Sequence, residues 1–302
     1  MKSILITGGS GFIGTNIIEA LKRTKPDLTI YNYDSHPSPK EGVINIIGNA
    51  AHFSPQDLPS EVEGVVHLLA LANEKYCSDL EYAQEINVGF TRKLLAWAQG
   101  QTNLKKFVFM STILAYDQHA TLPVSEDAKL YPHYTNYSFT KSLAEQYVRH
   151  FEMHYGLPAI IFRLSNIYGP YQRAINSPFL IPSKIVQALE EGKIEIRSGK
   201  PKRDWIYSAD AADAVVKSLD ASFTGTLNLG SGIGTSVEEL MRLIAAHLRV
   251  PYTSLDQPTT GPNNFYCDIT RIQKELEWSP TTSLKEGILH TIDHIKEELY
   301  SK

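Results

Sequence analysis

The fold is decided by residues 2–14, Lys2-Ser3-Ile4-Leu5-Ile6-Thr7-Gly8-Gly9-Ser10-Gly11-Phe12-Ile13-Gly14. The first part is apolar and β-branched, which is typical of a short buried strand. Gly8, Gly11 and Gly14 follow at the spacing G-x-x-G-x-x-G, and apolar residues then recur at helical intervals. A strand, a glycine turn and a helix N-terminus together predict an anion-binding site, because free backbone N–H groups and the positive end of the helix dipole point to one place.

A second predicted strand, residues 28–33, ends at Asp34, twenty residues after Gly14. An acid at this distance is typical of a dinucleotide site, where it binds the hydroxyls of the adenosine ribose. A carboxylate there favours the free 2′-hydroxyl of NAD and repels the 2′-phosphate of NADP. The competing interpretation is a glycine-rich turn before a packed helix, with an unrelated surface aspartate.

Composition narrows the function classes. The chain has 302 residues, 42% of them hydrophobic, and a net charge of −4, which gives no electrostatic reason to expect nucleic acid or an anionic membrane as a partner. No apolar run approaches the roughly 20 residues that span a bilayer, and no signal peptide precedes the first strand. Cys77 and Cys267 form neither a disulfide framework nor a metal-binding spacing. We therefore expect a cytoplasmic protein with a small-molecule partner and no metal.

Strands and helices alternate along the first half of the chain. Further strands are predicted at 43–47, 64–69, 106–111 and 159–164, and helices at 79–99 and 136–155. This alternation predicts an α/β fold with a doubly wound parallel sheet, whose ligands bind beyond the carboxyl ends of the strands. Asp34, Ser111, Thr112 and Asn166 fall at or just after such ends. His67 lies within an apolar strand, and we interpret it as a core histidine.

The second half of the chain is less regular. A helix is predicted over 178–191, strands over 194–197, 203–207 and 226–229, and two further helices open with capping-box patterns at Ser236 and Ser283. We expect residues 1–166 to form a cofactor-binding domain to which segments near 203–230 return. Residues 167–302 are expected to form a smaller substrate-binding lobe packed against it around a cleft.

Tyr137 and Lys141 carry the predicted chemistry. They are four residues apart, so they share one face of the helix over 136–155. A lysine cation beside a phenol favours the phenolate, and we expect it to lower the pKa of Tyr137 from about 10 towards neutrality. Such a group can exchange the proton of a carbinol during hydride transfer. The hydroxyl of Ser111 or Thr112 can hold the same substrate oxygen.

From Ile4 to about Gly287 the chain resembles the extended short-chain dehydrogenases/reductases, specifically the NAD-dependent sugar-nucleotide epimerase/dehydratase group. The motifs are the glycine turn, the Ser111–Tyr116 segment, the Tyr137–Lys141 pair, and segments 163–170, 203–207 and 276–280. The resemblance implies a Rossmann domain that binds NAD and a catalytic set of Thr112, Tyr137 and Lys141. It implies cofactor contacts for Gly8, Gly11, Phe12, Ile13, Gly14, Asp34, Asn49, Leu69, Asn87, Tyr137 and Lys141, and substrate contacts for Ser111, Asn166 and Arg203.

Four departures from this family bear on the substrate. Ile113 and Leu114 stand where the dehydratases have an Asp-Glu pair, which disfavours a 4,6-dehydratase. Gln257 opens segment 257–261, where the family has an arginine that pairs with the diphosphate. Near Phe179, an asparagine that often holds a substrate phosphate in the family is replaced. Asn49 replaces an adenine-binding aspartate but keeps an acceptor oxygen. Two residues, Arg173 and Arg197, could supply the positive charge of the family arginine that Gln257 replaces.

Three functions remain open from the sequence. The leading hypothesis is a 4-epimerase-like enzyme that holds NAD and exchanges a hydride at a sugar carbinol of a nucleotide sugar. The runner-up is an NAD(P)H-dependent reductase of a 4-keto-sugar nucleotide, which uses the same residues. The third is a non-catalytic NAD-binding sensor or scaffold. The resemblance also implies a homodimer through the helices that contain Phe90 and Tyr147.

Overall fold

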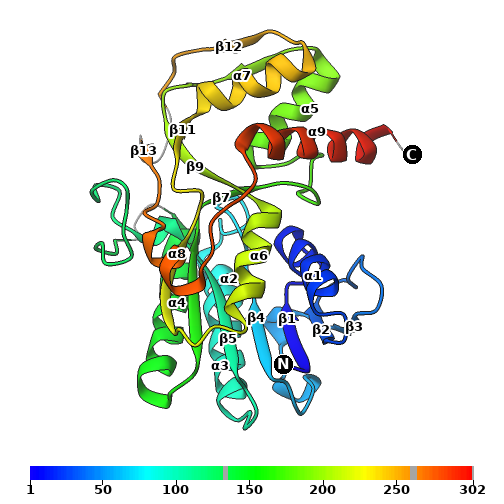
Figure 1. Cartoon of the computed structure of the whole chain (residues 1–302), viewed down its shortest axis with the longest axis vertical. Coiled ribbons are helices and arrows are strands. Elements are labelled where there is room, and N and C mark those ends of the chain that lie inside the picture. The colour runs from blue at the N-terminus through cyan, green and yellow to red at the C-terminus, as the bar shows by residue number, and fades with distance from the viewer. Residues whose placement is uncertain (132–134, 259–263, 301–302) are drawn as a thin grey trace.

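A seven-stranded parallel sheet forms the centre of the molecule, as the computed structural model shows (Figure 1). The structure describes residues 1–131, 135–258 and 264–300. The strand order is β10-β6-β5-β4-β1-β2-β3. Their bounds are β1 Ser3–Thr7, β2 Thr29–Asp34, β3 Ile44–Ile47, β4 Gly64–His67, β5 Lys106–Thr112, β6 Ala159–Leu164 and β10 Gly225–Leu229. The predicted doubly wound α/β fold is confirmed.

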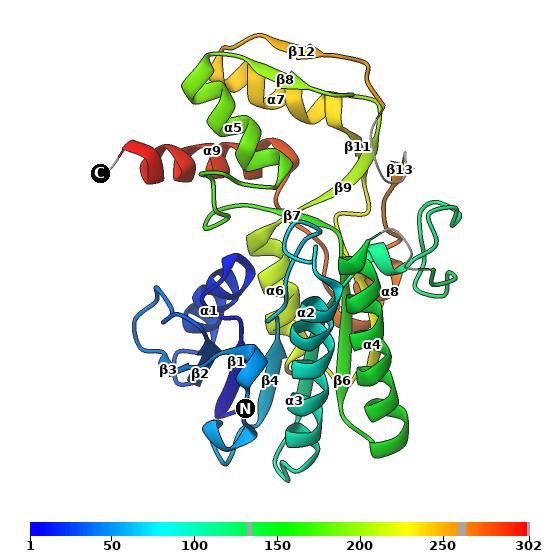
Figure 2. The same cartoon turned by 180° about the vertical axis from the view of Figure 1, so that it is seen from behind.

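Helices cover both faces of this sheet, because side chains alternate between the two faces along each strand. Ile4 and Ile6 of β1 pack on one face with α1 (Phe12–Thr24), α6 (Ser208–Ser218) and α8 (Thr270–Leu276). Leu5 packs on the other face with α3 (Phe90–Gln99) and α4 (Asn136–Tyr155). Figure 2 shows α3 and α4 in front of the sheet. Both faces are buried, which explains the nearly continuous apolar runs of the strands.

The remaining elements gather beyond the carboxyl ends of the strands (Figure 1). The helices α5 (Leu180–Glu191), α7 (Val237–Leu248) and α9 (Leu284–Tyr300) enclose a separate core around Ile185, Leu240 and Ile292. The small strands beside them are β7 Asn166–Tyr168, β8 Ile194–Ile196, β9 Lys202–Tyr207, β11 Gly234–Ser236, β12 Tyr252–Ser254 and β13 Asn264–Phe265. Strand β9 pairs with β7, β11 and β13. No helix in the described ranges is long and apolar enough to cross a bilayer.

Local sequence signals place several helix ends correctly. Ser236 caps α7 in a reciprocal capping box with Glu239, and α4 ends at Gly156 with φ +68°. The helix predicted over 79–99 differs, because it divides into α2 (Leu80–Gln84), a π-helical turn (Glu85–Gly89) and α3. The three-residue strand β7 and the short helix α8 have no periodic signal of their own, so the sequence did not predict them.

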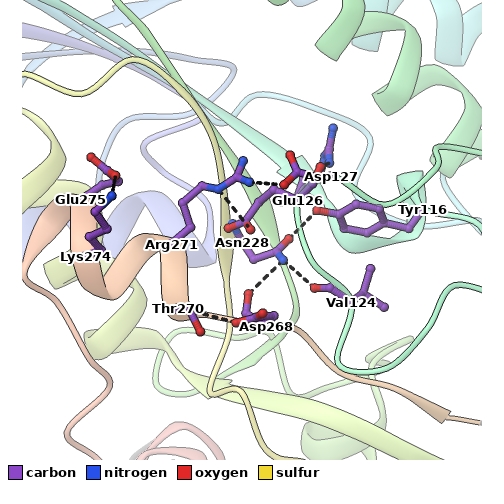
Figure 3. A network of polar contacts seen from close by, with 11 residues as sticks. Tyr116, Val124, Glu126, Asp127, Asn228, Asp268, Thr270, Arg271, Lys274 and Glu275 are labelled. Atoms are coloured by element: carbon purple, nitrogen blue, oxygen red, sulfur yellow. Dashed lines mark hydrogen bonds and ion pairs between the residues drawn. The ribbon is translucent and has the colours of Figure 1, made fainter.

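A network of polar contacts fastens the segment after β5 to β10 and α8 (Figure 3). The Asn228 amide donates to the carbonyls of Val124 at 2.8 Å and Asp268 at 3.0 Å, and its oxygen accepts from the Tyr116 hydroxyl at 2.6 Å. The Glu126 carboxylate accepts the Asn228 backbone N–H at 2.8 Å. These bonds satisfy buried polar groups in a segment that has no sheet ladder.

Because α1 lies in close contact with the turn before it, adding one methyl group at Gly14 should destabilise the protein. A Cβ at Gly14 would lie 2.4 Å from Gly9 Cα and 2.5 Å from the Gly8 carbonyl oxygen. We expect Gly14→Ala to lower the free energy of unfolding by about 1–3 kcal/mol, measured by urea denaturation. Gly100→Ala is the matched control, since Gly100 is exposed in helical conformation. Equal stability of the two variants would contradict this packing constraint.

Candidate active site

A cleft of about 1380 Å³ opens at the carboxyl ends of the sheet strands. This volume exceeds the range of roughly 300–1,000 Å³ that is usual for a single small-molecule site. All predicted site residues but one line it: Gly8, Gly11, Phe12, Ile13, Gly14, Asp34, Asn49, Leu69, Ser111, Thr112, Tyr137, Lys141, Asn166 and Arg203. The structure therefore brings together, in one cleft, side chains from segments far apart in the chain.

The three glycines of the turn are needed for different reasons. Gly8 has φ +78°, and a Cβ there would lie 2.8 Å from the backbone nitrogen of Leu69. Gly14 is held by the close backbone contact described above. Gly11 has only the Gly8 carbonyl oxygen near its missing Cβ, at 3.4 Å, and it faces the cleft. A side chain at Gly11 would fill space that the protein leaves open, which fits the close approach of a pyrophosphate.

Asp34 stands at the end of β2, at the edge of the cleft beside the turn. Its Oδ2 accepts the backbone N–H of Ser10 at 3.0 Å, and its Oδ1 accepts the Ser35 hydroxyl at 3.3 Å. These bonds hold the carboxylate where the hydroxyls of a ribose can reach it. Together with the space at Gly11, this donor and acceptor set fits NAD. Asn49 also lines the cleft, and its side-chain oxygen accepts the Ala51 N–H at 2.9 Å.

Asn87 does not line the cleft but is buried behind its wall, in the π-helical turn between α2 and α3. Its Oδ1 accepts the Leu71 N–H at 2.7 Å, and its Nδ2 donates to Thr140 Oγ1 at 3.0 Å. Asn87 thus ties the segment after β4 to helix α4. The structure therefore shows a positioning role for Asn87, and its contact with the cofactor stays a prediction.

Tyr137 and Lys141 lie on the first two turns of α4, and both side chains reach the cleft. Helix α4 begins at Asn136, because Thr135 caps it in a reciprocal capping box with Ser138. Thr112, at the end of β5, is hydrogen-bonded to the Tyr137 side chain. The neighbouring Ser111 hydroxyl instead donates to Glu145 Oε2 at 2.6 Å. The structure therefore distinguishes the two hydroxyls, and Thr112 is the one beside the phenol.

Burial dominates the protonation of this pair. It raises the pKa of Tyr137 to about 12, although the hydrogen bond from Thr112 partly opposes the shift. It lowers the pKa of Lys141 to about 7, against the opposing charge of Glu145. The expectation that Lys141 brings the pKa of Tyr137 towards neutrality is therefore wrong for the protein by itself. Removal from water favours the uncharged form of both groups.

Sequence reasoning missed the ion pair beneath these residues. Arg163 Nη2 lies 2.5 Å from Glu145 Oε1, and both side chains are only 1% exposed. The guanidinium lies 4.5 Å from the centre of the Tyr116 ring, and its Nη1 donates to the Glu126 carbonyl at 3.1 Å. A signal was present, since Lys141 and Glu145 continue the four-residue spacing from Tyr137 along one face of α4.

The substrate side of the cleft leads into a second cavity of about 550 Å³. Asn166 and Arg203 line both cavities, and the Asn166 amide donates to the Asp204 carbonyl at 3.1 Å. Phe179 lines the first cavity, and Gln257 and Arg197 line the second. Arg173 lines neither cavity, so the structure offers no support for it as the replacement cation. Thr259 to Gly261, the end of the departing segment, lie outside the described residues.

Two further sequence interpretations concern histidine and metal ligands. His67 is buried in β4, with its ring nitrogens 2.7 Å from Thr7 Oγ1 and 2.8 Å from Thr91 Oγ1. Burial holds its pKa well below the usual value, which confirms a neutral core histidine. Among residues 1–131, 135–258 and 264–300, no group of three His, Cys, Asp or Glu side chains could hold a metal ion.

The buried Lys141 predicts an unusual dependence of stability on pH. Its pKa falls from 10.5 to about 7 on folding, so between these values the unfolded chain binds more protons at this residue. We expect Lys141→Met to be more stable than the wild type at pH 7, by about 1.4 kcal/mol for each pKa unit removed. The gain should shrink as the pH rises towards 10, as measured by urea denaturation.

Lys93→Met, on the exposed face of α3, serves as the control and should show no pH-dependent difference from the wild type. A Lys141→Met protein that is less stable at pH 7, or a difference that does not change with pH, would show that the buried ammonium is better compensated than the structure indicates.

Comparisons with known proteins identify the family of this chain. The model of the NAD dependent epimerase/dehydratase family matches residues 4–230. A relative from Methanocaldococcus jannaschii, "Putative UDP-glucose 4-epimerase", is 30% identical over 97% of this chain and 98% of its own length. The dTDP-D-glucose 4,6-dehydratase of Mus musculus is 28% identical over 99% of this chain and 90% of its own length.

The solved structures show the same fold. A UDP-glucuronic acid 4-epimerase from Bacillus cereus, in complex with UDP-glucuronic acid and NAD, superposes with a TM-score of 0.88 at 24% identity. That match covers 99% of this chain and 100% of the other. The cofactor that the glycine turn and Asp34 predict, NAD, is also the cofactor of the matched family. The chain belongs to the NAD-dependent epimerase/dehydratase family.

Proposed function

We propose that this protein is a nucleotide-sugar 4-epimerase that uses NAD and employs Tyr137 as the acid/base. The observation that carries the proposal is the convergence of Thr112, Tyr137 and Lys141 in one cleft with the glycine turn. The same cleft continues into a second cavity, which suits an extended substrate. The names of a 4-epimerase relative and of a 4-epimerase structure support the same activity.

The reacting hydroxyl, on C4 of the sugar, would lie between Thr112 and Tyr137. Tyr137 as phenolate takes the hydroxyl proton while the carbinol hydrogen leaves C4 as a hydride, which produces a 4-keto sugar. When bound, NAD supplies the acceptor for that hydride and returns it. The keto sugar rotates within the cleft so that the hydride returns to the opposite face of C4. Tyr137 then gives the proton back to the C4 oxygen. The ammonium form of Lys141 stabilises the phenolate.

The residues after Thr112 disfavour a 4,6-dehydratase. Ile113 is buried and Leu114 is half-buried, in the turn that directly follows β5. Neither side chain can transfer the protons that elimination of water requires. A non-catalytic sensor is disfavoured for the opposite reason, since the three side chains that the reaction needs are all present at the cleft. A 4-keto-sugar reductase remains the second candidate, because it would use the same three side chains.

The homodimer remains part of the proposal through α3 and α4, the helices that contain Phe90 and Tyr147. Phe90 itself is buried in the core of the sheet domain, so α3 would contribute its exposed residues, such as Arg92 and Lys93. Tyr82 and Tyr147 are exposed on α2 and α4, so a dimer formed through this face would cover them.

Replacing the proposed acid/base should abolish turnover without removing the substrate site. We expect Tyr137→Phe to reduce the rate of 4-epimerisation by roughly 10²–10⁴-fold, because the phenol oxygen that exchanges the proton is lost. The measurement is NMR of product formation from UDP-glucose, UDP-N-acetylglucosamine and UDP-glucuronic acid. Tyr82→Phe is the control, since Tyr82 lines the same cleft. Unchanged turnover by Tyr137→Phe would remove this residue from the mechanism.

Cofactor consumption separates the epimerase from the reductase. An epimerase recovers its oxidised cofactor in every cycle, so the nicotinamide absorbance should not change while many equivalents of substrate react. We also expect mass spectrometry of the purified protein to find NAD and not NADP, because Asp34 repels a 2′-phosphate. Stoichiometric oxidation of NADPH with a 4-keto-sugar nucleotide would instead identify a reductase.

A further inference from the structure

The second cavity carries most of the positive charge on the substrate side. Its charged lining residues are Lys184, Arg197 and Arg203 against a single acid, Glu195. The larger cleft is more balanced, with Asp34 and Glu74 against Lys141 and Arg203. Arg203 lines both cavities, so an anion where the two cavities meet would lie beside its guanidinium.

Of these cations, Lys184 is half-buried whereas Arg197 is exposed. Lys184 lies on α5, and its Nζ donates a hydrogen bond to Gln187 Oε1 at 2.9 Å. Within the described ranges, Lys184 forms no ion pair with a carboxylate within 4.0 Å. An ammonium has three donors, and a partly buried charge is normally paired. Burial lowers the pKa of Lys184, although the more distant Glu195 and Glu191 oppose the shift.

We propose that Lys184 binds the diphosphate of a nucleoside-diphosphate substrate, together with Arg203 of the same cavity. Asn166 and Leu180 line both cavities, and Leu180 begins the helix that presents Lys184. Gln257 lines the same cavity but has no charge, and Arg197 lines it but is exposed, so half-buried Lys184 is the candidate for the second cation. This inference rests on the proposed function, because it takes the substrate to be a nucleotide sugar.

The test compares affinities for UDP and for uridine, which has the same base and ribose but no phosphate. Lys184→Met keeps the length of the side chain and removes its charge. We expect this variant to bind UDP roughly 10- to 100-fold more weakly, measured by calorimetry, since a hydrogen bond to a charged group is lost. Uridine binding, measured by ligand-observed NMR, should stay within about twofold of the wild type. Lys184→Arg should recover most of the UDP affinity.

Lys193→Met is the matched control. Lys193 lies just beyond the end of α5, is exposed, and lines neither cavity. It should bind UDP like the wild type, and thermal melting should show that all variants are folded. Turnover offers an independent readout, because loss of a diphosphate contact raises KM and leaves kcat nearly unchanged.

Three outcomes would overturn the inference in distinguishable ways. Wild-type affinity for UDP in Lys184→Met would show that Lys184 only shapes the cavity wall. Equal weakening of UDP and uridine would place Lys184 against the nucleoside instead of the phosphates. A wild-type protein that binds no UDP would contradict the proposed substrate class itself, and the inference would fail with it.

Discussion

The buried ion pair between Arg163 and Glu145 is the interaction on which the active site depends. It joins β6 to α4, and the Ser111 hydroxyl adds β5 to the same carboxylate. Helix α4 carries Tyr137 and Lys141, and β5 ends in Thr112, so this contact fixes the distance between the hydroxyl and the phenol. Removing one partner from a buried pair leaves an uncompensated charge, which destabilises a protein by roughly 3–5 kcal/mol.

Other buried polar side chains extend this control to the loops. Asn87 binds the backbone after β4, and the Asp204 carboxylate accepts the N–H groups of Ser231, Gly232 and Cys267. Asn228 holds the segment that follows β5 (Figure 3). Loops at the carboxyl ends of strands lack a regular ladder, so their backbone groups need such partners. Much of the polar sequence near the cleft therefore supports the geometry of the site.

The electrostatics of the site follow from desolvation more than from attraction between neighbours. Lys141 lies 4.2 Å over the ring of Phe109, in surroundings that solvate an ammonium poorly. The same exclusion of water disfavours the phenolate of Tyr137. At neutral pH the Tyr137 phenol is thus uncharged, whereas Lys141, with a pKa of about 7, is only partly protonated. An acid and a base with pKa values shifted by burial are typical of catalytic sites.

The sequence by itself determined the elements whose signals lie within a few residues. These are the strand and glycine turn at residues 2–14, the caps at Ser236 and Gly156, and the alternation that predicts a parallel sheet. It also determined the spacing of Tyr137 and Lys141, because helical periodicity alone puts them on one face. The short strand β7 and the π-helical turn at Asn87 escaped prediction, because contacts from distant segments stabilise them.

Only the tertiary structure decided which groups face each other and how much water they retain. It assigned Thr112 and not Ser111 to the phenol, placed Asn87 behind the cleft, and reversed the expected shift in the pKa of Tyr137. It also brought Lys184 to the cavity that Arg203 lines. The physical reason is that desolvation and long-range pairing depend on segments that are separated by tens of residues, and no local pattern records those distances.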